Sequence, residues 1–344
     1  MTLGNLRRSI SLYVALATAT LTTAACASSG RLAAIKLADD GVAASNETKK
    51  LLALTSETLN PYVEGQFLTA PLRGTDAPDE ALLSSIEKVN SALSVRVSAM
   101  SQLAKCYGAL KDYASYDASA AVEKSVSDLA GSISAYAAVV APGTVLISGT
   151  AATLASKAAG GVAGRAQLTQ LKAASRMIRE QIRAFRELLV KESDLLESIG
   201  RVTTSTSATN ARMVWELGIG QPDSILSSAL AANGLDYDAK TFPDLMKSLE
   251  SVKSDKPAPD GCAKPCDTQA ARLRFGVSQV VRQRAIRSID LRKEAVANQA
   301  DTLQALEDAH RDFEADAFVD NADIATELEM LKSTVDALVA AKGK

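Results

Sequence analysis

Histidine is almost absent from this chain, since His310 is the single histidine among 344 residues. The sequence also lacks the H-E-x-x-H, P-loop and G-x-S-x-G motifs. His310 falls on an apolar seam of a predicted helix, which favours a hydrogen-bonded interior residue over a catalytic base or a metal ligand. We therefore predict a protein that is not an enzyme, with no cofactor, no metal site and no small-molecule substrate.

Aromatic residues and prolines are also few, at 4% of the chain and nine residues respectively. Alanine is abundant, and the alternating pattern of half-buried strands is scarce. This composition predicts an all-α protein, an elongated helical bundle whose helices pack through small side chains.

An excess of positive charge is missing too. If residues 1–25 are removed, the 38 basic residues lose Arg7 and Arg8, which leaves 36 against 40 acidic residues and a net charge of −4. This balance argues against a nucleic-acid partner and against a protein that coats an anionic membrane.

The amino terminus has the three parts of a secretory signal. Arg7 and Arg8 precede an apolar run from Ile10 to about Leu21, which is too short to span a bilayer, and small residues then lead to Cys26. The stretch Thr23-Ala24-Ala25-Cys26 resembles the lipobox of bacterial lipoproteins, although Thr23 stands where leucine is usual. The resemblance implies cleavage before Cys26, diacylation of its sulfur and stable anchoring by two acyl chains.

This resemblance covers residues 1–26 alone. Ala27 and Ser28, with no aspartate after the cysteine, favour by analogy the outer membrane, facing the periplasm, over the inner membrane. The alternative is ordinary cleavage after Ala25-Cys26-Ala27, which would discard the cysteine and leave a secreted protein.

A heptad repeat is the clearest pattern in the rest of the chain. Apolar residues recur at alternating spacings of three and four over 82–140 and 145–202, with Pro142-Gly143 between the two runs. The pattern predicts a long antiparallel coiled-coil hairpin, about 79–141 and 145–202, in which residues whose numbers sum to about 287 face each other. Tyr136 would then oppose Ala151, with Leu129 opposite Ala158 and Val126 opposite Gly161.

The remaining segments read as separate parts. Residues 26–75 hold one helix, Leu37–Leu59, which stops before Asn60-Pro61. The Ser/Thr-rich stretch after Val202 predicts a short, irregular region over 203–266, and 267–344 predicts C-terminal helices, a long one to Asp320 and a shorter one over 324–341.

Three cysteines remain after Cys26. Cys262 and Cys266 lie in a loop, and in an oxidising envelope their C-x3-C spacing predicts a local disulfide. Cys106 is then left over as a half-buried helix residue, with pairing to either of the other two left open.

Charges along the helices are segregated. Residues 272–293 carry seven basic residues and one acid, 294–329 carry eleven acids and Arg311, and 165–186 carry six basic residues and Glu180. We expect acidic and basic faces to meet within the bundle or to stand in water, and recruitment of another protein is the alternative.

Leu129 to Ser156 is a run of 28 residues without a charge. Each arm is too short for a conventional membrane span. The run is either tight packing, covered by the chain or by another copy, or a hairpin that enters a bilayer, and its tip comprises Val139, Val140, Pro142, Gly143, Val145, Leu146 and Ile147.

Together these patterns predict a non-enzymatic cell-envelope lipoprotein that acts as a structural or partner-binding helical scaffold. Its partners would be the membrane, through the N-terminal lipid, and another protein or a second copy. The alternative, similar only in outline to the α-helical pore-forming toxins, is a membrane-inserting protein that uses residues 129–156.

Overall fold

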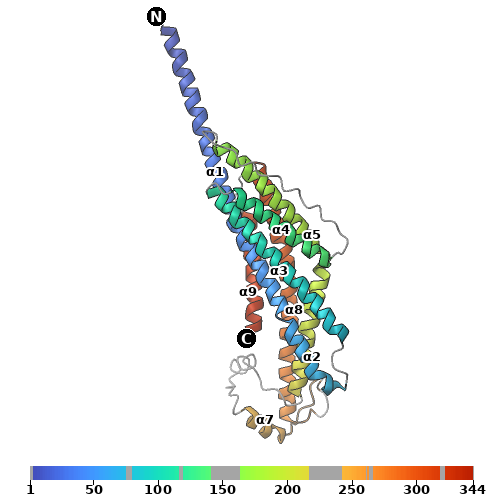
Figure 1. Ribbon diagram of the computed structural model, residues 1–344. Coiled ribbons are helices and arrows are strands. Elements are labelled where there is room, and N and C mark those ends of the chain that lie inside the picture. The colour runs from blue at the N-terminus through green and yellow to red at the C-terminus, as the bar shows by residue number, and fades with distance from the viewer. Residues whose placement is uncertain are drawn as a thin grey trace. The chain divides into compact units, whose positions relative to one another are not determined.

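The computed structural model describes residues 3–74, 80–115, 119–140, 163–216, 242–260, 262, 266–317 and 322–343, with the backbone alone before Ser28 (Figure 1). Within these ranges the secondary structure is helical, apart from one isolated antiparallel bridge between Lys253 and Thr268. The all-α prediction is therefore confirmed. The helices are α1 Leu3–Ser56, α2 Leu59–Arg73, α3 Glu80–Ser115, α4 Ser119–Val140, α5 Ala163–Glu216, α7 Phe242–Glu250, α8 Gln269–Glu314 and α9 Ala322–Gly343.

The helices contribute to two compact units. Unit 1 consists of Met1–Lys50, Ala92–Glu192 and Asn298–Leu331, and unit 2 of Leu51–Ser91, Ser193–Ala297 and Lys332–Lys344. Each unit is thus assembled from segments that are distant in the sequence. The consecutive segments 26–75, 76–202, 203–266 and 267–344 describe the chain in a different way and stay a prediction.

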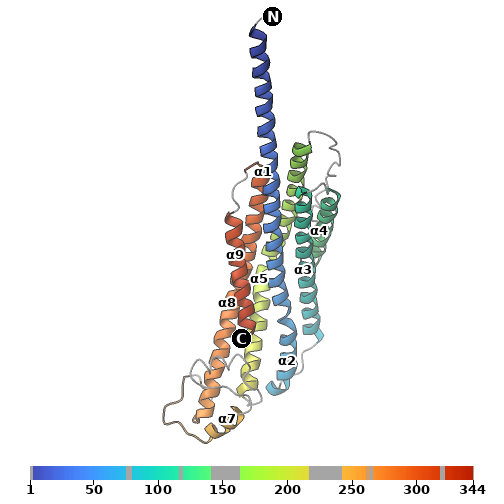
Figure 2. The same cartoon turned by 90° about the vertical axis from the view of Figure 1, so that its left-hand side faces the viewer.

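The predicted first arm of the hairpin, 79–141, is not one helix. α3 ends at Ser115 and α4 begins at Ser119, and the two lie side by side (Figure 1 and Figure 2). They are antiparallel, because the Cys106 Sγ lies 2.9 Å from the Ser125 carbonyl oxygen while the Arg96 Nε lies 2.8 Å from the Tyr136 hydroxyl. The serines at both helix ends and the intervening aspartate favour caps and turns over a helix interior, although the heptad rhythm is the same on both sides.

α3 is also antiparallel to α5. Arg96 meets Glu192, and the Tyr113 side chain meets Gln170, so the numbers of facing residues sum to about the predicted value. Tyr136 packs against Phe185 and Glu192, because α4 folds back along α3 and therefore runs parallel to α5. The proposed corner at Pro142-Gly143 and the proposed partners Ala151, Ala158 and Gly161 lie outside the described residues.

The prediction that the helical pattern breaks after Val202 is wrong, since α5 continues to Glu216. The hydroxyls of Thr203 and Thr209 donate to the carbonyls of Ile199 and Ser205 in the preceding turn, which satisfies these polar groups within the helix. Asn210 is buried against α2, where its amide oxygen accepts from the Thr69 hydroxyl at 3.0 Å. Contacts within unit 2 thus override the weak helix propensity of this stretch.

Two helix ends also differ from the prediction. A new helix, α2, begins at Leu59, since Pro61 falls in its first turn where no backbone N–H is needed. α8 ends at Glu314 rather than Asp320. The backbone N–H of Ala317 donates to the Asp312 carbonyl and that of Asp316, at φ 60°, to the Phe313 carbonyl, which is a Schellman cap with aspartate in the left-handed position.

The core of unit 1 is built where large side chains meet small ones. Tyr107 of α3 is fully buried, and its ring fills the space above Gly41 of α1, where an added Cβ would lie 2.3 Å from ring carbons. The same unit buries apolar residues of α4, α5 and α8, including Val126, Leu129, Ile133, Ile178, Ile182, Phe185, Leu303 and Leu306. In unit 2, Met246 of α7 packs on Ala270 and Val277 of α8, with Leu249 and Leu273 at the edge of this cluster.

Candidate functional site

Residues shortly after Cys26 contact the rest of unit 1. Gly30 is buried, and Arg31 donates from Nε to the Ala114 carbonyl at 2.7 Å and from Nη2 to the Ser115 carbonyl at 3.0 Å. These carbonyls belong to the last turn of α3, which has no intrahelical donors for them. Cys26 itself lies in the part of α1 that is described by its backbone alone.

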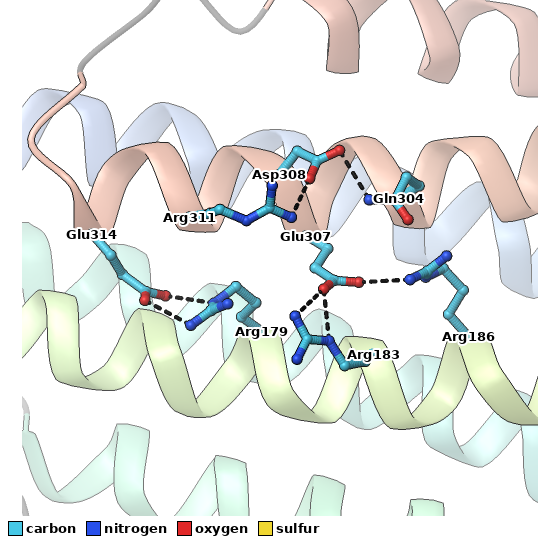
Figure 3. Close-up of polar contacts among 8 residues, drawn as sticks. All are labelled: Arg179, Arg183, Arg186, Gln304, Glu307, Asp308, Arg311 and Glu314. Carbon is cyan, nitrogen blue, oxygen red and sulfur yellow. Dashed lines mark hydrogen bonds and ion pairs between the residues drawn. The ribbon is translucent and has the colours of Figure 1, made fainter.

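An ionic seam joins α5 to α8 within unit 1 (Figure 3). Arg176, Arg179, Arg183 and Arg186 follow one stripe of α5, and on α8 Glu307 and Glu314 stand seven residues apart. Arg179 forms a bidentate pair with Glu314, with its Nε at 3.0 Å from one carboxylate oxygen and its Nη2 at 2.9 Å from the other. A basic face of α5 and an acidic face of α8 therefore meet within unit 1, which is one of the two arrangements predicted from the sequence.

Glu307 is the most buried member of this seam. Its side chain is 2% exposed, and it accepts from the Nε and Nη2 of Arg183 at 2.8 and 2.6 Å and from the Nη2 of Arg186 at 3.1 Å. The hydrogen bond and charge of Glu307 raise the pKa of Arg183. One carboxylate therefore binds two guanidiniums, and the pairing sets the register of α5 on α8.

A second polar centre surrounds His310, which is fully buried in unit 1. Its Nε2 lies 2.9 Å from the Tyr107 hydroxyl and its Nδ1 lies 2.7 Å from the Ser175 hydroxyl. Burial, with a smaller effect from the charge of Arg179, lowers the pKa of His310 to about 3. The prediction of a satisfied interior histidine is confirmed.

A serine hydroxyl bonded to a histidine resembles a catalytic nucleophile with its general base. Burial of Ser175 and His310, however, excludes nucleophilic catalysis at this centre. Ser175, Tyr107 and His310 each have 0% of their surface exposed, so no substrate atom reaches the serine oxygen. The three residues come from α5, α3 and α8. We interpret the centre as a hydrogen-bonded tie that fixes the relative register of three helices.

A third polar centre joins α3, α4 and α5. Arg96 and Glu192 form an ion pair, the Arg96 Nε donates to the Tyr136 hydroxyl at 2.8 Å, and this hydroxyl donates to Glu192 Oε2 at 2.5 Å. The Arg96 guanidinium also lies over the Tyr136 ring, at 5.1 Å from its centroid. Desolvation raises the pKa of Tyr136 to about 12 and lowers that of Arg96.

Sequence reasoning missed this third centre. Arg96 falls between Leu93 and Met100 at the seam spacing, and Glu192 occupies a seam position of α5. An arginine and a glutamate that interrupt two apolar seams at numbers that sum to 288 are the signal that could have revealed the pair.

Unit 2 contains an apolar groove of about 180 Å³ between α2, α3 and α5. The hydroxyls of Ser85 and Thr203 in its wall donate to backbone carbonyls of their own helices. The lining is therefore dominated by hydrocarbon, from Leu59, Tyr62, Ile86, Val89, Ile199 and Val202.

The three cysteines that follow Cys26 form one disulfide and one free thiol. Cys262 and Cys266 form a disulfide with a Cα–Cα distance of 6.1 Å, which confirms the predicted local pairing. Cys106 is free and fully buried rather than half-buried, and its Sγ donates to the Ser125 carbonyl. Burial, with a smaller effect from Asp128, raises the pKa of Cys106 to about 12.

The predicted tip is described only at its beginning. Val139, 42% exposed, and Val140 end α4, whereas Pro142, Gly143, Val145, Leu146 and Ile147 lie outside the described residues. In the part of the chain that the structure covers, no helix combines the length and the apolarity that crossing a bilayer requires. Within the same part, histidine, cysteine and acidic side chains form no group of three that could bind a metal ion.

Comparisons with known proteins assign no family, since the chain matches no protein-family model, no curated protein and no solved structure.

Proposed function

We propose that the protein is a lipid-anchored protein of the bacterial cell envelope, whose helical body serves as a structural or partner-binding scaffold. The observation that carries the proposal is the signal-like segment that ends in Thr23-Ala24-Ala25-Cys26. The fold is compatible with this boundary, because Gly30 is buried and Arg31 ties α1 to the end of α3 just after the predicted cleavage site. Removal of residues 1–25 would leave these contacts intact.

A scaffold role agrees with the use of the polar residues in unit 1. Ser175 and Tyr107 each form a hydrogen bond with His310, and the buried carboxylates of Glu307 and Glu314 bind arginines of α5. These contacts hold helices in register, and the His310, Ser175 and Tyr107 side chains have no exposed surface on which to bind a substrate. The proposal is therefore for a protein that positions other components rather than one that transforms a small molecule.

Metabolic labelling with an alkyne analogue of palmitate tests the anchor. We expect label on the wild-type chain and none on Cys26→Ala, and we expect the variant to leave the membrane fraction. Cys106→Ala is the matched control, because Cys106 is buried within unit 1 and should not affect labelling. Equal labelling of wild type and Cys26→Ala, or an unlabelled wild type, would reject the lipid anchor.

Site-specific photo-crosslinking in intact cells tests the scaffold role. Leu32 and Val190 are apolar side chains of unit 1 that are 67% and 58% exposed, and a photoreactive amino acid at either site should form a discrete adduct with an envelope protein or a second copy. The buried Leu103 is the control site. No adduct from either exposed site, together with an unchanged envelope after deletion of the gene, would argue against a scaffold.

A membrane-inserting function is the second candidate, and one feature of α4 favours it. After Asp128 this helix carries no charge on either face, and its exposed side there consists of Gly131, Ser134, Ala135, Ala138 and Val139. If this end enters a bilayer, Val139→Asp should abolish dye release from uncharged liposomes, whereas Ser127→Asp, on the charged part of α4, should not. Equal release by both variants would reject insertion through α4.

A further inference from the structure

The third polar centre differs from the ionic seam in where its charges lie. In the seam, arginines of α5 pair with glutamates of α8 across the interface, so separation of the two helices breaks the ion pairs. Arg96 and Glu192, by contrast, belong to α3 and α5, and α4 lies over them without contributing a charge. Undocking of α4 from α3 and α5 would therefore not separate the two charges.

Docking of α4 nevertheless removes this ion pair from water. Arg96 is 1% exposed and Glu192 is 5% exposed, while Tyr136 of α4 is fully buried against both. Withdrawal of a charged pair from water opposes docking, and the hydrogen bonds of one tyrosine hydroxyl offset it only in part. The apolar side of α4 then supplies the attraction, through Val122, Val126, Leu129, Ile133 and Ala137.

Other polar ties between α4 and its neighbours are few. Besides Tyr136, the Cys106 Sγ donates to the Ser125 carbonyl, and the ion pair Lys124–Asp128 lies within α4 itself. Among the described residues, no side chain of α4 forms an ion pair with another helix. α5 and α8, in comparison, share ion pairs at Glu307 and Glu314 in addition to the Ser175–His310 hydrogen bond.

We propose that α4 is a separable arm of unit 1, which undocks as one piece from α3 and α5 while the remaining helices stay folded, and that Tyr136 is its latch. Opening rehydrates the Arg96–Glu192 pair and exposes the apolar stripe of α4. The inference goes beyond the proposed scaffold function, because it concerns the folded body and holds with or without a lipid anchor. Undocking would separate α4, which carries no charge after Asp128, from the other helices of unit 1.

Hydrogen exchange of the purified full-length chain, followed by mass spectrometry, tests the proposal. Without denaturant at pH 7, we expect peptides from 124–136 to exchange at least ~10-fold faster than peptides from 175–190 of α5 and 299–313 of α8. Tyr136→Phe, which leaves Arg96 and Glu192 without the hydroxyl, should accelerate the α4 peptides about a further 10-fold and leave the other two unchanged.

Tyr107→Phe is the matched control, since it removes the hydroxyl of another fully buried tyrosine that contacts His310 rather than α4. It should leave the ratio of α4 to α5 exchange unchanged. A triple variant, Arg96→Met, Glu192→Leu and Tyr136→Phe, replaces the charged pair and the hydroxyl that bonds to it by apolar groups, and it should slow exchange of α4 relative to Tyr136→Phe.

Two results would overturn the proposal. One is a wild-type protein in which α4 exchanges at the rate of α5 and α8, and the other is a Tyr136→Phe variant that accelerates all three helices alike. If Tyr136→Phe does not fold, the wild-type comparison alone decides. Neither result affects the labelling of Cys26, so failure here is distinct from failure of the proposed function.

Discussion

Acidification should weaken this fold through His310, the single histidine of the chain. In the folded protein its imidazole is fully buried between Tyr107 and Ser175, and desolvation lowers its pKa to about 3. In the unfolded chain the pKa returns to about 6.5. The folded state therefore favours the neutral ring, and the stability that this preference contributes is complete above about pH 6.5 and is lost as the pH falls from there towards 3.

The magnitude follows from the separation of the two pKa values. Between them, each pH unit costs ~1.4 kcal/mol of unfolding free energy per histidine. Acidification from pH 7.5 to pH 5.0 crosses about 1.5 units of this window, so we expect the free energy of unfolding to fall by about 2 kcal/mol. Most carboxylates remain ionised down to about pH 5, which leaves His310 as the main titrating side chain in this interval.

Urea unfolding, followed by far-ultraviolet circular dichroism at pH 7.5, 6.0 and 5.0, measures the effect. The His310→Gln variant keeps a hydrogen-bonding side chain but cannot take up a proton, so its unfolding free energy should stay nearly constant over the same range even if it is lower at pH 7.5. A wild type whose stability does not change between pH 7.5 and 5.0 would refute the reasoning. A variant that retains the wild-type slope would refute it equally, because the slope would then come from other groups.

Three further predictions rest on single contacts. Gly41→Ala should destabilise the protein by about 2–4 kcal/mol in urea unfolding, because its Cβ would lie 2.3 Å from the Tyr107 ring. Gly108→Ala is the control and should be neutral or slightly stabilising, because an added Cβ at this helical glycine would enter open space. Glu307→Ala should cost about 1–2 kcal/mol, since it removes a buried carboxylate that binds both Arg183, which is 48% exposed, and Arg186, while Asp128→Ala in the exposed pair with Lys124 should cost less than about 1 kcal/mol, and equal losses would contradict our reading of the seam. Cys106 should resist alkylation by iodoacetamide at pH 8 in the native protein and react fully in urea, because burial raises its pKa to about 12, and rapid native labelling would show that the Cys106–Ser125 contact opens.

Several features of the fold could be predicted from the sequence because they depend on local patterns. The spacing of apolar residues predicts helices, since one face of a helix must be buried. The position of His310 on such a seam predicts an interior histidine, and the close spacing of Cys262 and Cys266 predicts their disulfide. The separated charges of α5 and α8 likewise indicated that a basic face meets an acidic one.

The path of the chain between helices could not be predicted in the same way. The heptad rhythm is identical on both sides of residues 116–118, so periodicity does not distinguish one long rod from two antiparallel helices. The Ser/Thr-rich end of α5 has weak helix propensity, and only its hydrogen bonds within the helix and the burial of Asn210 against α2 keep it helical. Arg96 and Glu192 are 96 residues apart, so their pairing is evident only once the register of α3 on α5 is known.

The sequence by itself therefore determined the all-α class, the helical faces and the local disulfide, because each follows from side chains that are neighbours along the chain. Only the tertiary structure decided that α4 folds back along α3, that His310 meets Tyr107 and Ser175, and that Glu307 binds two arginines. These contacts join residues from different helices. Their formation depends on how much apolar surface each competing arrangement buries and on whether every buried polar group finds a partner, and both quantities are properties of the packed molecule.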